Sequence, residues 1–159
     1  MPYYFDCLPV PFGTIAAVVD DDGAVTELHL TADVAALETR AVRDAGRVRE
    51  VARQVADFFA RQRDGFDLVL RPAGTAFQQK VWQALCGIPF GQTISYQELA
   101  RRVGDARAAQ AVGQANNRNP IPLIIPCHRV IGKNGALVGF GGGLDLKREL
   151  LNFETPLLL

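Results

Sequence analysis

The sequence predicts an α+β fold in two parts, an N-terminal α/β domain followed by a mainly helical C-terminal domain. Three observations predict it: strand-like apolar runs before residue 31, apolar residues at helical spacing further on, and a Pro72-Ala73-Gly74 stretch that separates two regions of different pattern. The chain of 159 residues is 48% hydrophobic and 21% charged, which is typical of a globular protein and too apolar for a disordered one. We therefore expect domains at residues 1–73 and 74–159.

The N-terminal part begins with a hairpin signal. Apolar runs at residues 14–19 and 25–30 flank Asp20-Asp21-Asp22-Gly23, and an Asp-Gly pair favours a tight turn between antiparallel strands. An amphipathic helix is predicted next, because apolar residues recur at steps of three and four. They are Val48, Val51, Val55, Phe58 and Phe59. Residues 66–70 are predicted to form a further strand.

The C-terminal part is predicted to be helical. Apolar residues first recur from Phe77 to Leu85 at the spacing of a helix packed against a core. The stretch Ser95-Tyr96-Gln97-Glu98 is a capping-box pattern that starts a second helix, and Gly104 stands where that helix would end. Asp105 is placed to cap a third helix that runs to about Asn117.

Two short helices joined by a glycine turn form a helix-turn-helix pattern. The second of them, at residues 105–117, carries small residues over much of its surface. They are Ala106, Ala108, Ala109, Ala111, Gly113 and Ala115. Small side chains allow close approach to a DNA groove, but they also suit the packing of one helix on another. DNA binding is therefore one of two interpretations of this pattern.

Charge and cysteine content narrow the classes of protein. Residues 1–74 hold 8 Lys and Arg against 12 Asp and Glu, while residues 75–159 hold 9 against 5, so a basic working face is expected on the C-terminal part. No apolar run is long enough for a membrane span, and the first residues lack a signal-peptide pattern. Three cysteines without a Cys-x-x-Cys pair disfavour disulfides and a cysteine-rich zinc site, and favour a reducing cytoplasm. Cys7 and the lone His29 are interpreted as structural.

The residues that carry chemistry follow an apolar, proline-containing segment. Residues 121–126 are predicted to be extended and to end at Cys127-His128-Arg129-Val130. A cysteine next to histidine and arginine has surroundings that can favour the thiolate. A small, inert, buried cysteine is the alternative, and the Cys-His pair alone does not decide between them.

The wider sequence resembles the O6-alkylguanine-DNA alkyltransferases, also called methylated-DNA–protein-cysteine methyltransferases. Residues 119–130, which end in Pro-Cys-His-Arg-Val, are similar to the active-site signature of that family. The resemblance continues at Ile94-Ser-Tyr-Gln-Glu-Leu-Ala100 and at Gly141-Gly-Gly-Leu144, with Lys147 and Glu154 further on. It implies a ribonuclease-H-like sheet in the N-terminal domain and a helix-turn-helix in the C-terminal domain.

The resemblance implies a role for each catalytic residue. Cys127 matches the alkyl acceptor, and His128 matches the base that deprotonates the thiol through a bridging water. Glu154 matches the carboxylate that orients this histidine, in the manner of a catalytic triad. Asn119 matches the asparagine that holds the turn before the active-site loop. Tyr96 matches the tyrosine that supports the flipped-out base and helps neutralise charge as guanine leaves.

The resemblance also implies a substrate pocket and a DNA-binding face. The pocket residues are Val130, Phe140, Gly141 and Lys147, with backbone groups of Val130 and Gly141 holding the base. The helix at 105–117 is expected to lie against the minor groove. The implied DNA-binding residues are Arg101, Arg107, Ala109, Gln110, Gly113, Arg118 and Arg129. Gln110 departs from the family, which carries an arginine at this position to fill the space left by the extruded base.

The implied function is DNA repair by a protein that is used once. The alkyl group of O6-alkylguanine, and also of O4-alkylthymine, in double-stranded DNA would pass irreversibly to Cys127, with no cofactor, no metal and no obligate protein partner. We expect a cytoplasmic monomer. Two other classes stay open: a helix-turn-helix protein that senses alkylated bases without repairing them, and a thiol hydrolase that uses Cys127, His128 and Glu154 on a soluble ester or amide.

Overall fold

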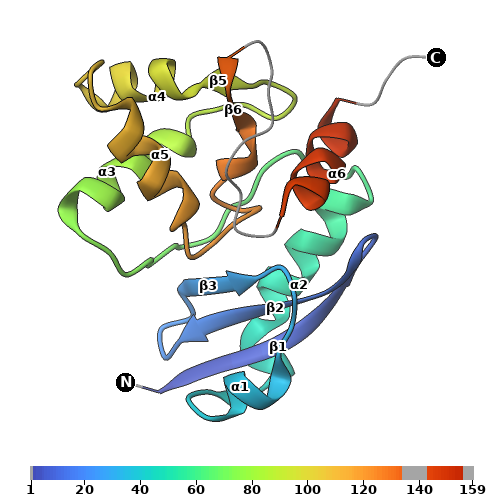
Figure 1. Ribbon diagram of the computed structural model, residues 1–159. Helices are drawn as coiled ribbons and strands as arrows, with labels where there is room; N and C mark the ends of the chain where they lie inside the picture. The colour runs from blue at the N-terminus through green and yellow to red at the C-terminus, as the bar shows by residue number, and fades with distance from the viewer. Residues whose placement is uncertain (1, 134–142, 156–159) are drawn as a thin grey trace. The chain divides into compact units, whose positions relative to one another are not determined.

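The chain has an α+β fold, and it divides into two compact units, Met1–Ala73 and Gly74–Leu159 (Figure 1). The structure is a computed structural model that describes residues 2–133 and 143–155. The predicted α+β class is confirmed. In the described residues no helix combines the length and the apolar character that a bilayer crossing requires.

A four-stranded sheet forms the centre of the N-terminal unit. Its strands lie in the order β3-β2-β1-β4: β2 is antiparallel to both β3 and β1, whereas β4 is parallel to β1. The strands are β1 (Tyr3–Val10), β2 (Gly13–Asp20), β3 (Val25–His29) and β4 (Val42–Arg43). The predicted hairpin between β2 and β3 is confirmed, because the buried Asp20 carboxylate accepts hydrogen bonds from the amides of Asp22 and Ala24 in the turn.

Two helices complete this unit, α1 (Val34–Glu38) and α2 (Ala45–Phe59). The predicted apolar face of α2 is confirmed: Val48, Val51, Val55 and Phe58 are buried, and the helix packs on β1 and β2. The predicted strand at residues 66–70 is wrong, since only Leu70 forms a bridge, with Val25. Gln54 on α2 explains this. Its side-chain amide bonds both to the Asp67 carbonyl and to the Asp67 amide, at 2.9 and 2.8 Å, and so takes the place of a neighbouring strand.

Helices dominate the C-terminal unit. They are α3 (Ala76–Leu85), α4 (Tyr96–Val103), α5 (Ala109–Asn117), α6 (Leu144–Glu154) and the short 3₁₀ helix η1 (Cys127–Arg129). Two short parallel strands, β5 (Ile94–Ser95) and β6 (Val130–Ile131), pair beside them. The apolar stripe predicted for α3 is confirmed at Val81, Trp82 and Leu85, which are buried, and α3 packs against both α4 and α5.

The helix starts differ in part from those predicted. The Ser95 hydroxyl caps the Glu98 amide at 3.0 Å, but the Glu98 carboxylate turns to Arg101 and Arg102 and does not close the capping box. Gly104 ends α4 as predicted, with φ of 110°. The third helix starts at Ala109 and not after Asp105, because the Asp105 carboxylate accepts from the Arg107 amide and holds a local turn.

The segment before Cys127 is a turn, so the predicted extended conformation of residues 121–126 is wrong. The Ile125 amide donates to the Ile121 carbonyl at 2.9 Å, and Leu123 has φ of 73° in the left-handed region. The Asn119 side chain holds both ends of the turn. Its Nδ2 donates to the Ile125 carbonyl at 2.7 Å, and its Oδ1 accepts from the Ile121 amide at 2.9 Å.

Candidate active site

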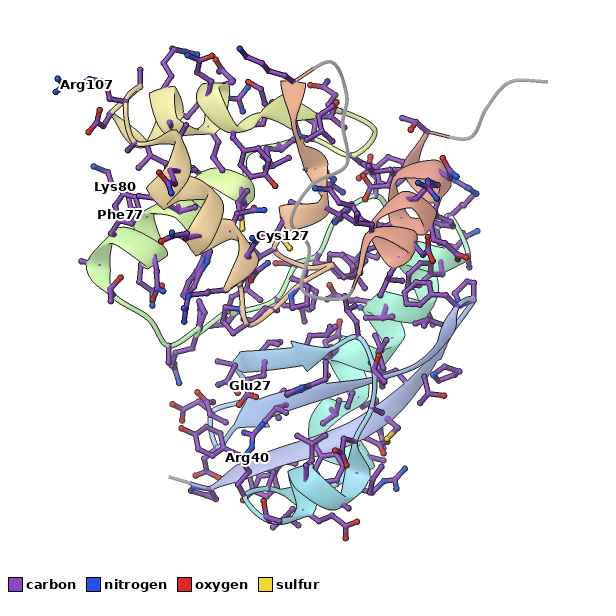
Figure 2. All side chains as sticks on the ribbon, in the orientation of Figure 1. Glu27, Arg40, Phe77, Lys80, Arg107 and Cys127 are labelled. Carbon is purple, nitrogen blue, oxygen red and sulfur yellow. The ribbon has the colours of Figure 1, made fainter. Side chains whose placement is uncertain are left out.

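Cys127 lies at the first position of η1, directly after the turn that Asn119 holds (Figure 2). Its amide donates to the Ile125 carbonyl at 2.7 Å, and its side chain is buried. Cys7 and Cys86 are less buried than Cys127. Cys127 is therefore fixed by backbone hydrogen bonds on a turn whose apolar residues pack into the core.

The resting Cys127 side chain is a thiol. Burial raises its pKa to about 11, although the Asn119 amide and the positive charge of Lys147 act in the opposite direction. The sequence-based interpretation of a thiolate-favouring environment is therefore wrong for the resting protein. The thiol needs a base if it is to act as a nucleophile, because the thiolate is the reactive form.

His128 and Glu154 are brought together although 26 positions separate them in the chain. His128 Nε2 lies 2.7 Å from Glu154 Oε2, and only 0% and 2% of the two side chains is exposed. Burial opposes ionisation of Glu154, but hydrogen bonds from His128 and Arg129 prevail and lower its pKa to about 2. The carboxylate thus accepts the Nε2 proton. The other ring nitrogen, Nδ1, is buried without a hydrogen-bond partner among the described residues and is the one that can accept a proton.

Arg129 belongs to this buried cluster and not to a DNA-binding face. Its Nε donates to Glu154 Oε1 at 2.7 Å and its Nη2 to Oε2 at 2.8 Å, while its Nη1 donates to the Ile88 carbonyl at 2.7 Å. Only 8% of the side chain is exposed. The prediction that Arg129 binds DNA is therefore wrong, since a guanidinium held on three sides in the interior does not reach a phosphate.

Tyr96 and Asn116 lie beside the cysteine. Burial raises the pKa of Tyr96, as does the electrostatic effect of the nearby Cys127, whereas the Asn116 side chain opposes this rise. Asn116 Nδ2 lies 3.4 Å from the Cys127 carbonyl, and its Oδ1 is buried without a partner among the described residues. Sequence reasoning missed Asn116. The available signal was an amide at position i+4 from Val112, on the apolar face of α5.

The predicted pocket residues are placed only in part. Lys147 is fully buried, and its Nζ donates to the Val130 carbonyl at 2.6 Å. Burial lowers the pKa of Lys147 to about 8, while the nearby Cys127 acts to raise it. The ammonium also lies 5.9 Å from the centre of the Tyr96 ring. Phe140 and Gly141 lie outside the described residues.

The remaining predicted DNA-binding residues lie on or around α5 and α4. Arg107, just before α5, is 95% exposed and extends away from the ribbon (Figure 2). Gln110 and Arg118 are exposed, whereas Ala109 is half-buried. Arg101 is exposed and paired with Glu98 at 2.7 Å. Gly113 is half-buried, and a Cβ added there would lie 3.5 Å from the Tyr96 ring. None of these side chains joins the buried cluster.

Across residues 2–133 and 143–155, no group of three or more His, Cys, Asp and Glu side chains is arranged to hold a metal ion.

These elements define a class of protein: a helical domain with a buried cysteine, histidine and glutamate at its centre. The chain belongs to the 6-O-methylguanine DNA methyltransferase family, whose DNA-binding domain matches residues 76–156. The chain is 44% identical to a methylated-DNA–protein-cysteine methyltransferase of Methanosarcina barkeri, over 95% of this chain and 96% of that protein. It is 39% identical to the constitutive one of Bacillus subtilis, over 95% and 94%.

A solved structure agrees with these relatives. The crystal structure of Mycobacterium tuberculosis OGT in complex with DNA matches with a TM-score of 0.87 and 40% identity, over 95% of this chain and 92% of that one. The similarity therefore extends over both units and is not confined to the C-terminal one.

Proposed function

We propose that this protein repairs DNA by moving the methyl group of O6-methylguanine onto Cys127, irreversibly and once per molecule. The observation that carries the proposal is the buried set of Cys127, His128 and Glu154 in a chain that is 44% identical, almost end to end, to a methylated-DNA–protein-cysteine methyltransferase. The first of these residues supplies the nucleophile, and the other two supply and orient the base.

The reaction needs a proton transfer before the displacement, because burial holds Cys127 as a thiol. His128 Nδ1 takes this proton through a bridging water, while Nε2 remains bonded to Glu154. The thiolate sulfur then forms a bond to the methyl carbon as the bond from that carbon to O6 breaks. The electron pair stays on guanine, where the Tyr96 hydroxyl helps to neutralise it. The product thioether has no good leaving group, so Cys127 is not regenerated.

The exposed side chains around α5 support a DNA-binding face. We propose that α4 and α5 act as a helix-turn-helix and that α5 approaches the minor groove with Ala109, Gln110 and Gly113. Arg107 and Arg118 are exposed at its two ends and are suited to phosphate contacts. Arg101 would add a third contact after it leaves Glu98. The similarity to Mycobacterium tuberculosis OGT, which has been solved in complex with DNA, supports DNA binding by this chain.

The pocket is assigned to the residues beside Cys127. We propose that Tyr96, Lys147 and the backbone of Val130, with Phe140 and Gly141, receive a base that has been rotated out of the duplex. O4-alkylthymine is a second expected substrate. The Val130 carbonyl is already bonded to Lys147, so this lysine sets how that carbonyl meets the base.

The N-terminal unit is proposed to be a ribonuclease-H-like domain with a supporting role. The strand order β3-β2-β1-β4, with β4 parallel to β1, supports this assignment. We further propose that the protein acts as a cytoplasmic monomer without a protein partner. All catalytic side chains come from one unit of one chain, and an acceptor thiol requires a reducing compartment.

Intact-protein mass after mixing with a duplex that contains O6-methylguanine tests the proposal against its two alternatives. A permanent gain of one methyl group per molecule, equal to the amount of unmodified guanine restored in the duplex, is the expected result. Binding without a mass change would identify a sensor of alkylated bases. Turnover of a soluble ester or amide without a lasting mass change would identify a hydrolase.

A further inference from the structure

Arg129 and His128 share one carboxylate. The guanidinium makes a bidentate pair with Glu154 at 2.7 and 2.8 Å, and His128 Nε2 bonds to the same Oε2 atom at 2.7 Å. Such charge-assisted pairs fix both partners in orientation. Any change at Arg129 therefore reaches the histidine through Glu154.

Other contacts hold the guanidinium in place. Its Nη1 donates to the Ile88 carbonyl, just after α3, and its central carbon lies 5.8 Å from the centre of the Phe90 ring. The arginine thus links the chain after α3 to the last residue of α6. Its geometry is fixed by contacts within the C-terminal unit.

The charges around His128 oppose one another. Burial lowers the pKa of His128 most; Glu154 raises it, while Arg129 from η1 and Lys147 from α6 lower it. A buried carboxylate that acted alone would favour the imidazolium form, which cannot accept the thiol proton. Arg129 offsets part of this effect of the carboxylate and acts in the same direction as burial.

We propose that Arg129 is a positioning residue for alkyl transfer: its bidentate contact fixes the carboxylate that orients the His128 ring, and its charge offsets that of Glu154 and so helps to keep His128 a neutral base. This inference rests on the proposed role of His128 as the base for Cys127. It assigns Arg129 to the chemical step rather than to DNA affinity.

The chain allows a direct measurement because it contains only two histidines. In a His29→Gln background, NMR titration of the one remaining imidazole reports His128 alone. Arg129→Gln is expected to raise the pKa of His128 by about one unit, because a positive charge is lost nearby. Glu154→Gln is expected to lower it. The acid limb of the transfer rate should move in the same two directions.

Two substrates separate chemistry from DNA contact. Arg129→Gln should slow methyl transfer about tenfold or more at neutral pH, and by the same factor with duplex DNA and with free O6-methylguanine. Arg118→Ala is the matched control, since it removes an exposed arginine and should slow only the duplex reaction. A loss in Arg129→Gln confined to the duplex would overturn the inference.

The titration gives a second way to overturn it. An unchanged His128 titration in folded Arg129→Gln protein contradicts the proposed electrostatic role. If Arg129→Gln does not fold, Arg129→Lys provides the test, because lysine keeps the positive charge but cannot make the bidentate contact. In this variant transfer should slow, while the pKa of His128 should stay within a few tenths of a unit of its original value. An unchanged rate or a shifted titration in Arg129→Lys contradicts the inference. The His128 titration needs no substrate, so the two claims can fail separately. Absence of transfer in the unaltered protein would refute the proposed function, while the titration would still test the electrostatic role of Arg129.

Discussion

Two carboxylates in the C-terminal unit have the same local arrangement and opposite surroundings. Glu98 on α4 is shared by Arg101 and Arg102, and Glu154 at the end of α6 is shared by His128 and Arg129. Hydrogen bonds from these partners lower the pKa of Glu98 to about 2, and they outweigh burial to bring the pKa of Glu154 to about 2. The surroundings differ sharply: the Glu98 side chain is 30% exposed and the Glu154 side chain 2%.

The difference shows that a lowered pKa does not by itself mark a functional carboxylate. Water and salt screen the ion pairs of Glu98, and such surface pairs contribute little to the free energy of folding. Glu154 has no solvent to replace a lost partner, so its charge controls the protonation of His128 directly. The following predictions test this contrast between the buried cluster and the exposed face.

The largest effect is expected at the nucleophile. Cys127→Ser should abolish methyl transfer, because a serine hydroxyl is a far weaker nucleophile than a thiolate at neutral pH. DNA binding should remain, since Cys127 is buried and the proposed DNA contacts are exposed. Transfer is measured with a radiolabelled methyl group and binding by fluorescence anisotropy. Residual transfer in Cys127→Ser would place the acceptor elsewhere.

The two carboxylates provide a matched pair. Glu154→Gln should slow transfer about 100-fold, since the amide no longer orients the ring as a carboxylate does and His128 becomes less basic. Glu98→Gln should leave the rate on free O6-methylguanine within about twofold of that of the unaltered protein, because surface pairs of this kind contribute little to stability. Single-turnover rates of the two variants check this. Equal rates would show that the Glu154 carboxylate has no part in the mechanism.

The pH profile follows from the same cluster. His128 must be neutral to accept the thiol proton, and burial lowers its pKa below the ordinary value of 6.5. Transfer should therefore persist down to a pH below 6.5 and fall only as the ring becomes protonated. A rate that already falls between pH 8 and 7, together with an NMR titration of His128 in the same range, would contradict the lowered pKa of His128.

The exposed face should respond to salt. DNA binding should weaken as salt is added, and Arg107→Ala and Arg118→Ala should each reduce the slope of log affinity against log salt by about one. Binding titrations at several salt concentrations measure this slope. A flat response would mean that the basic C-terminal half does not contact phosphate.

The smallest effect is expected at Gln110. Glutamine keeps a planar amide but lacks the charge and stacking area of the arginine found in the family. Gln110→Arg should therefore speed transfer from duplex DNA by about two- to fivefold, the size of an exposed cation–π contact, and leave the free base unaffected. If both substrates respond equally, position 110 does not support base extrusion.

The sequence predicted much of this architecture because its signals were local. The Asp-Gly hairpin, the apolar stripe of α2 and the end of α4 at Gly104 each depend on neighbouring residues. The errors arose from distant partners. The Gln54 side chain hydrogen-bonds to the backbone amide and carbonyl of Asp67, and the Asn119 side chain holds both ends of a turn that was predicted to be extended.

The site was predictable only to the extent that a resemblance supplied it. Periodicity and spacing left Cys127 undecided between a nucleophile and an inert thiol, and they do not connect His128 with Glu154. The burial of Arg129 was not predictable, because arginine is usually exposed and its partners Ile88 and Glu154 lie on other segments. Asn116 was missed for the same reason: its contact with Cys127 depends on the turn between them.

Peptide mapping after a single turnover tests the central claim most directly. The protein is mixed with a duplex that contains one O6-methylguanine, digested, and searched by mass spectrometry for the methylated cysteine. The account predicts one methyl group, on Cys127, with Cys7 and Cys86 unmodified. Burial raises the pKa of Cys86 as well, but no histidine–glutamate pair is bonded beside it among the described residues. A methyl group on Cys86 or Cys7, or on none of the three, would contradict the account.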